Sequence, residues 1–187
     1  VLNAEEKILN IESQLFSEIC QFLLSQISEI HTNAKAINRM DLLSGFAATA
    51  INQIYVRPRL TNNPECKIVA GRHPVVDQLL PSTEKFIPND LSIHSNKNQI
   101  QLITGPNMAG KSTYLRQIGL ITLMAQIGSF VPAKSATIGI VDRLFTRVGA
   151  SDNLAGGEST FLVEMNEAAN ILNNATDSSL ILYKPIP

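Results

Sequence analysis

A stretch bounded by glycines in the middle of the chain has the composition of a phosphate-binding loop. From Gly105 to Ser112 it reads GPNMAGKS and satisfies the pattern GxxxxGK(S/T) in full. The two glycines let the backbone fold around phosphates without Cβ clashes, so that successive N–H groups point inward as an anion nest. We expect Lys111 to reach the β- and γ-phosphates, Ser112 to ligate Mg²⁺ and Thr113 to lie on the α-phosphate side. The pattern predicts a site for ATP and Mg²⁺ at Gly105, Pro106, Asn107, Met108, Ala109, Gly110, Lys111, Ser112 and Thr113.

A phosphate-binding loop of this kind lies between a strand and a helix, and the sequence predicts both. The apolar run Ile100–Thr104 predicts a strand before it, and an amphipathic pattern predicts a helix after it to about Ile127. The start of that helix would add unsatisfied N–H groups and the positive end of its dipole. A chance match in a glycine-containing turn rarely has this strand-loop-helix context, so we favour nucleotide binding.

The rest of the second part of the chain alternates strands and helices. Lys67–Ala70, Leu144–Val148 and Leu180–Tyr183 read as strands, and residues 160–173 read as a helix. Such alternation predicts an α/β architecture with a largely parallel sheet.

The first part of the chain is helical. The apolar period predicts amphipathic helices over residues 3–30 and about 34–54. Residues 31–33 are compatible either with a break between two helices or with one continuous helix. We expect their apolar stripe to pack in a core rather than against a partner. Prolines replace the helical period after Tyr55, so we place a boundary there, between a helical segment 1–54 and a domain 55–187. The stripe of the first helix consists of Ile8, Ile11, Leu15, Ile19, Phe22 and Leu23.

Composition limits the classes of function. The chain has 187 residues, 44% of them hydrophobic, and a formal net charge of −1, so it has no global basic field that would draw it to nucleic acid or an anionic membrane. The two cysteines, Cys20 and Cys66, have no metal or redox spacing and read as ordinary thiols of a reducing compartment. Neither a secretory pattern nor an apolar run of membrane-spanning length is present, so we expect an intracellular protein, of bacterial cytoplasmic type, without a membrane partner.

Several motifs in order resemble one family. With the loop and its continuation to Gln117, the chain resembles the ATPase domain of the MutS family of DNA mismatch-repair proteins over residues 1–182. The resemblance implies an incomplete P-loop (ABC-type) nucleotide-binding domain of α/β class, preceded by the α-helical end of the lever and core region. The other motifs that carry it are GRHPVV at Gly71–Val76, FIPN at Phe86–Asn89, DRLFTRVG at Asp142–Gly149 and GESTFLVEM at Gly157–Met165.

The resemblance implies further site residues. Asn107 would contact the γ-phosphate or the attacking water, and with Lys111 it is our candidate for catalysis; as an alternative, an Asn commonly stabilises its own turn. Phe86 and Ile87 would pack against adenine, although the residues alone leave a core role for Phe86 equally open. Ser159 would reach the γ-phosphate of a partner subunit's ATP, whereas the alternative is a helix cap.

Partners follow from the same resemblance. It implies a homodimer or heterodimer with a second MutS-like subunit, mismatched DNA bound through other domains of the parent, and a downstream mismatch-repair factor.

A His before Pro reads as structural, so we assign His73 no chemistry. We expect Arg143 and Arg147 to be solvated or to lie between subunits.

The chain departs from the family after Leu182. There the family continues into an Asp-Glu pair that supports Mg²⁺ and polarises the attacking water. Lys184 stands at the Asp position and Pro185 at the Glu position, and neither can do this chemistry. We therefore expect a fragment with an unrelated or misread tail, for which nucleotide binding is a safer expectation than turnover.

Three functions remain to be weighed. The first is the ATP-binding part of a mismatch-repair ATPase, in whose parent ATP binding and hydrolysis control a DNA-bound clamp. The second is a hydrolysis-deficient nucleotide-binding or interaction module. The third, another ABC-type DNA-maintenance ATPase, is disfavoured because several motifs match at once.

Overall fold

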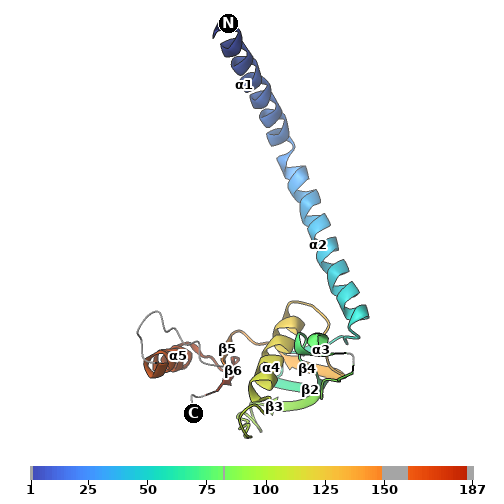
Figure 1. Ribbon diagram of the computed structural model, residues 1–187, viewed down its shortest axis with the longest axis vertical. Coiled ribbons are helices and arrows are strands. Elements are labelled where there is room, and N and C mark those ends of the chain that lie inside the picture. The colour runs from blue at the N-terminus through green and yellow to red at the C-terminus, as the bar shows by residue number, and fades with distance from the viewer. Residues whose placement is uncertain (1, 82, 149–159, 185–187) are drawn as a thin grey trace. The chain divides into compact units, whose positions relative to one another are not determined.

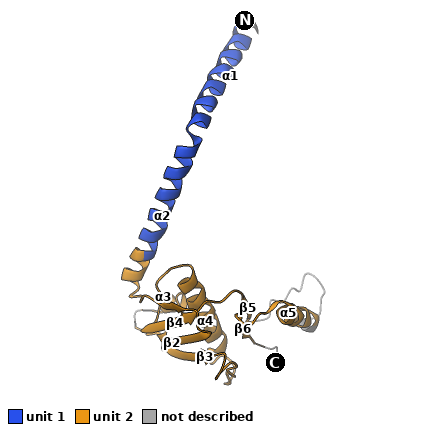
Figure 2. Cartoon of the chain, turned by 180° about the vertical axis from the view of Figure 1, so that it is seen from behind, with its two compact units in different colours: residues 1–46 blue, residues 47–187 orange. Residues whose placement is uncertain are grey.

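The chain divides into two units, residues 1–46 and residues 47–187, which are coloured separately in Figure 2. The computed structural model describes residues 2–81, 83–148 and 160–184. The first unit consists of helix α1 (Leu2–Ser25) and most of helix α2 (Ile27–Asn52), whose last residues belong to the second unit. The interruption that the sequence left open lies at Gln26, and residues 31–33 are inside α2.

The apolar stripe of α1 is exposed. Leu15, Ile19 and Phe22 each leave half or more of their surface accessible. The core packing that we expected for this stripe is therefore not formed within the described residues. The period of a helix determines that one face is apolar, but only a neighbouring element can cover that face.

The main sheet of the second unit has four strands in the order β1-β4-β2-β3. These are β1 (Arg59–Thr61), β2 (Glu65–Gly71), β3 (Asn89–His94) and β4 (Ser135–Gly139). Only β1 and β4 are parallel, whereas β2 is antiparallel to both β3 and β4. The expected largely parallel character is wrong here. A parallel crossover usually contains a helix that packs on the sheet, and among the described residues between β2 and β3 the one helix is α3 (Val76–Leu79), with four residues.

Helix α4 (Lys111–Gln126) packs on this sheet and forms the core with it (Figure 1). Ile118 and Ile121 of α4 are fully buried together with Ile68 of β2 and Ile138 of β4. Each such side chain stabilises the fold by about 1.5–3 kcal/mol through burial. The core thus fixes α4, and with it the loop that precedes the helix.

A second sheet pairs β5 (Leu144–Arg147) with β6 (Leu180–Tyr183) in parallel. Helix α5 (Thr160–Asn174) lies between them in the chain, so these three predicted elements are confirmed. At the start of the pair, Asp142 accepts hydrogen bonds from the hydroxyls of Thr176 (2.7 Å) and Ser179 (3.1 Å), which lowers the pKa of its carboxyl. Leu182 of β6 is buried in the core beside α4.

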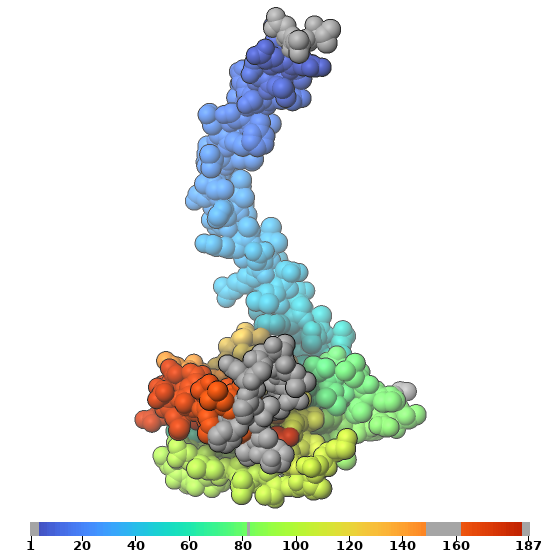
Figure 3. All heavy atoms as spheres, turned by 60° about the vertical axis from the view of Figure 1, so that its left-hand side comes forward, coloured from blue at the N-terminus to red at the C-terminus, as the bar shows by residue number. Residues whose placement is uncertain are grey.

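The strand predicted at Ile100–Thr104 is not formed. Residues 99–110 have no strand assignment, and Ile100 and Leu102 are 89% and 86% exposed. The stretch that leads into the loop lies on the surface of the second unit, in yellow-green in Figure 3. An apolar run forms a strand only where a neighbouring strand takes its N–H and C=O groups, and none of the described strands pairs with this segment.

No helix in the described ranges has both the length and the hydrophobicity that crossing a bilayer would require.

Candidate nucleotide-binding site

The loop before α4 is curled by residues with positive φ. Gly105 has φ 155°, Met108 has φ 63°, and Gly110, at the cap position of α4, has φ 83° in the left-handed region. A Cβ at Gly110 would have no atom within 4 Å. The backbone conformation, rather than space, therefore requires glycine at Gly110.

Lys111 closes the loop on itself. Its Nζ donates to the carbonyl oxygens of Gly105 at 2.6 Å and Pro106 at 2.5 Å. Ala109 N also donates to Pro106 O at 3.4 Å. An ammonium has three donors, and two of those of Lys111 bind the loop carbonyls. The positive charge is thus held at the turn, at the start of α4.

The loop borders a cavity of about 820 Å³ that two distant segments share. Gly110, Lys111 and Thr113 of the loop are among its lining residues, and so are Phe86 and Ile87. Cavities of 300–1,000 Å³ hold small ligands in proteins. The fold has therefore brought the loop and the segment with Phe86 and Ile87 to one space of small-molecule size, which Glu84, Lys85 and Asp90 also line.

The predicted site residues do not all lie in this cavity. Ala109 joins the lining residues, and Phe86 is half-buried while Ile87 is exposed. Neither Gly105 to Met108, which includes Asn107, nor Ser112 is among the lining residues. Ser159 and Pro185 lie outside the described residues.

Ser112 has a contact that the sequence did not predict. The ammonium of Lys184, 72 residues further on, donates to the Ser112 hydroxyl at 3.1 Å. Mg²⁺ takes oxygen ligands from carboxylates, carbonyls, hydroxyls and water, and a hydroxyl held by an ammonium faces a positive charge. The arrangement does not fit the Mg²⁺ that we expected at Ser112.

Comparison with known proteins identifies the family. The family described as MutS domain V matches residues 101–186. Along all of this chain, the DNA mismatch repair proteins MutS of Salinibacter ruber and Chlorobaculum tepidum are each 55% identical, over 186 residues. That of Bacteroides thetaiotaomicron is 56% identical over 98% of the chain. The chain belongs to the MutS family. It spans 20–21% of the length of these relatives.

Arg147 in β5 and Arg143, just before β5, have different surroundings. Arg147 is only 6% exposed, and its guanidinium pairs with Glu167 of α5 at 2.7 Å. The solvated placement that we expected as one option for Arg147 is wrong, because α5 supplies a carboxylate that the strand pattern cannot reveal. Its placement between subunits stays a prediction. Arg143 is exposed and donates to the carbonyl of Asn174 at 2.5 Å.

The structural role expected of His73 is confirmed. Its Nδ1 accepts the backbone N–H groups of Val75 at 3.3 Å and Val76 at 3.2 Å, at the start of α3. Burial, and then the charge of Arg116, lower the pKa of His73. The ring therefore stays neutral and works as an acceptor, which a protonated ring cannot do.

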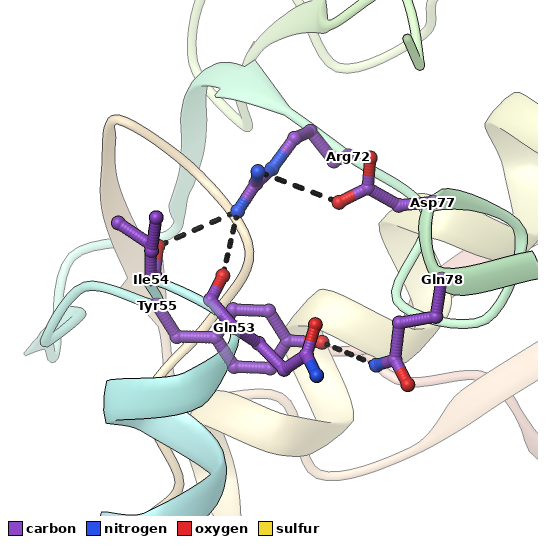
Figure 4. A network of polar contacts seen from close by, with 6 residues as sticks. All are labelled: Gln53, Ile54, Tyr55, Arg72, Asp77 and Gln78. Carbon is purple, nitrogen blue, oxygen red and sulfur yellow. Dashed lines mark hydrogen bonds and ion pairs between the residues drawn. The ribbon is translucent and has the colours of Figure 1, made fainter. Parts of the chain in front are cut away.

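Arg72, in the same motif of this MutS family chain, joins two elements of the second unit (Figure 4). Its Nη2 donates to the carbonyls of Gln53 (3.1 Å) and Ile54 (3.4 Å), just after α2, and its Nη1 pairs with Asp77 at 3.4 Å. A guanidinium suits carbonyl groups at the end of a helix. Sequence reasoning missed this role, since the partners are 18 and 19 residues away.

Proposed function

We propose that the second unit binds ATP through the loop Gly105–Thr113, as part of the ATPase region of a MutS family mismatch-repair protein. The observation that carries this proposal is the 820 Å³ cavity that the loop shares with Phe86 and Ile87. A nucleotide needs both an anion-binding loop and an apolar surface for its base, and both border this one space.

Each residue has a distinct task in this proposal. The N–H groups at the start of α4 and the ammonium of Lys111 attract the phosphates, because both present positive charge at the same turn. Asn107, exposed in the loop, contacts the γ-phosphate through its amide. Phe86 and Ile87, which line the same cavity, receive the adenine.

For the whole protein, we propose that ATP binding and hydrolysis control a clamp on mismatched DNA. The support is that the relatives are DNA mismatch repair proteins of bacteria. In this proposal other domains bind the DNA, a second MutS-like subunit, identical or related, contributes its Ser159 to the site, and a downstream repair factor reads the nucleotide state. A cytoplasmic location follows from the same function.

One observation favours a second candidate, a module that binds nucleotide without hydrolysing it. Lys184 holds the Ser112 hydroxyl, and a lysine has donors but no acceptor with which to support Mg²⁺. Binding and turnover are therefore separate questions for this chain.

The test is a titration with a fluorescent ATP analogue, accompanied by a phosphate-release assay. Lys111→Ala should weaken binding by about tenfold or more, since a hydrogen bond to a charged group contributes about 1.5–3 kcal/mol. The matched control is Lys97→Ala, which removes an exposed lysine from a turn outside the cavity and should leave affinity unchanged. Absence of binding even at high nucleotide concentration, or equal affinity of Lys111→Ala and the native chain, would contradict the proposal. Phosphate release separates the ATPase from the binding module.

A further inference from the structure

We propose that Lys184 takes the place of the divalent cation in this site, so that this chain binds nucleoside phosphates without Mg²⁺. The inference rests on the proposed function, because it concerns the same loop. It goes further by naming the ionic form of the ligand, which is the metal-free nucleotide.

The position of Lys184 is set by the second sheet. Its backbone N–H donates to the carbonyl of Arg147 at 2.7 Å, which continues the pairing of β6 with β5 by one residue. The guanidinium of Arg147 is buried and paired with Glu167. The main chain that carries the ammonium is therefore held at the end of a strand.

The ammonium meets α4 at its first turn. Lys184 Nζ lies 3.1 Å from the hydroxyl of Ser112, the residue that follows Lys111. Leu182, two residues earlier, packs in the core, and a Cβ at Gly119 would lie 3.0 Å from its Cδ1. β6 thus packs against α4 in the core, so Lys184 and Ser112 extend from two elements that are in contact.

The charges of the first turn then come from two lysines. Lys111 is held against the loop carbonyls and Lys184 against Ser112. An ammonium is a compact charge that binds phosphate oxygens, as Mg²⁺ does in other phosphate sites. A metal ion at Ser112 would have to displace the Lys184 ammonium or share the oxygen with a like charge, which is unfavourable. The structure thus supplies its own cation at this point.

The experiment compares nucleotide affinity with EDTA and with Mg²⁺, using a fluorescent ATP analogue and the full chain. The native chain should bind at least as tightly in EDTA as with Mg²⁺, because Mg²⁺ complexes the nucleotide and adds a like charge beside Lys184. Lys184→Met should lose about tenfold in EDTA, since it removes one charge-assisted hydrogen bond. Lys184→Arg keeps the charge and should retain binding in EDTA. Lys184→Asp should bind only when Mg²⁺ is present.

Control variants separate this inference from the proposed function. Lys97→Met removes an exposed lysine elsewhere and should behave as the native chain does, while thermal melting shows whether each variant is folded. If the native chain binds only with Mg²⁺, or if folded Lys184→Met binds normally in EDTA, the inference is overturned and the proposed function stands. If the native chain binds in neither buffer, both are overturned.

Discussion

Tyr114, in the first turn of α4, donates a hydrogen bond from its phenol to the backbone carbonyl of Asp90 in β3, at 2.7 Å. Both residues line the cavity that the loop borders. Asp90 in turn accepts the N–H of Ala70 on its side chain at 2.6 Å, where β2 is irregular and Ala70 has φ 49°. Burial raises the pKa of Tyr114, which keeps the phenol protonated as a donor. One side chain therefore ties the helix that follows the loop to the sheet beneath it.

Removing this tie should affect both stability and ligand affinity. Tyr114→Phe deletes one hydrogen bond, which contributes about 0.5–1.5 kcal/mol, and it frees the first turn of α4 from β3. We expect a lower free energy of unfolding and weaker binding of a fluorescent ATP analogue. The matched control is Tyr55→Phe, whose hydroxyl accepts a hydrogen bond from Gln78 at 3.3 Å outside the cavity. It should lower stability without changing affinity, and an equal loss of affinity in both variants would contradict this role of Tyr114.

Two glycine substitutions should have opposite effects. A Cβ at the buried Gly71 would lie 2.7 Å from Gln117 Nε2 and 2.8 Å from Ile68 Cγ2. Gly71→Ala should therefore destabilise the second unit by about 1–3 kcal/mol, the usual cost of overpacking. Gly45, inside α2, has nothing within 4 Å of a Cβ, so Gly45→Ala should stabilise its helix by roughly 0.5–1 kcal/mol. Chemical denaturation followed by circular dichroism measures both free energies of unfolding. An unchanged free energy of unfolding in Gly71→Ala would show that the core can rearrange around the added methyl group.

The stability of the second unit should fall as pH drops below about 6.5, the usual pKa of histidine. The pKa of His73 is lowered in the folded chain, so below 6.5 the unfolded chain binds a proton that the folded chain does not. The contribution of neutral His73 is therefore complete above 6.5 and is lost as pH falls toward the lowered pKa. Thermal melting between pH 8 and pH 5 measures the slope. His73→Asn keeps an acceptor for Val75 and Val76 but does not titrate, so an unchanged slope in this variant would assign the effect to another group.

The two thiols should differ in reactivity. Burial raises the pKa of Cys66 to about 11, and only the thiolate attacks thiol reagents. Cys20, on α1, is partly exposed. Titration of the native chain with a chromogenic disulfide should modify Cys20 rapidly and Cys66 only after unfolding. Cys20→Ser should remove the rapid phase, and a rapid phase that persists in this variant would show that the core opens around Cys66.

Local pattern was sufficient for several elements of the site. The spacing of Gly105, Gly110 and Lys111 located the loop, and the apolar periods on its C-terminal side predicted α4, β5, α5 and β6. These features depend on what each segment does with its own backbone and side chains: glycine adopts positive φ, and an apolar period selects helix or strand. The prediction of a strand at Ile100–Thr104 was wrong, because a strand, unlike a helix, depends on a neighbouring segment for its backbone hydrogen bonds.

Local pattern alone was enough for three features, which are the glycine and lysine spacing of the loop, the family resemblance and the type of most elements after Gly110. Other features depend on tertiary packing. These include the antiparallel pairing of β2 and the burial of Arg147 against Glu167. They also include the cavity that Phe86 and Ile87 share with the loop, and the contact of Lys184 with Ser112. Arg147 and Glu167 are 20 residues apart in the sequence, and Ser112 and Lys184 are 72 residues apart. Such contacts arise because packing brings distant segments together to bury apolar surface, and a local pattern carries no record of which segment becomes the neighbour.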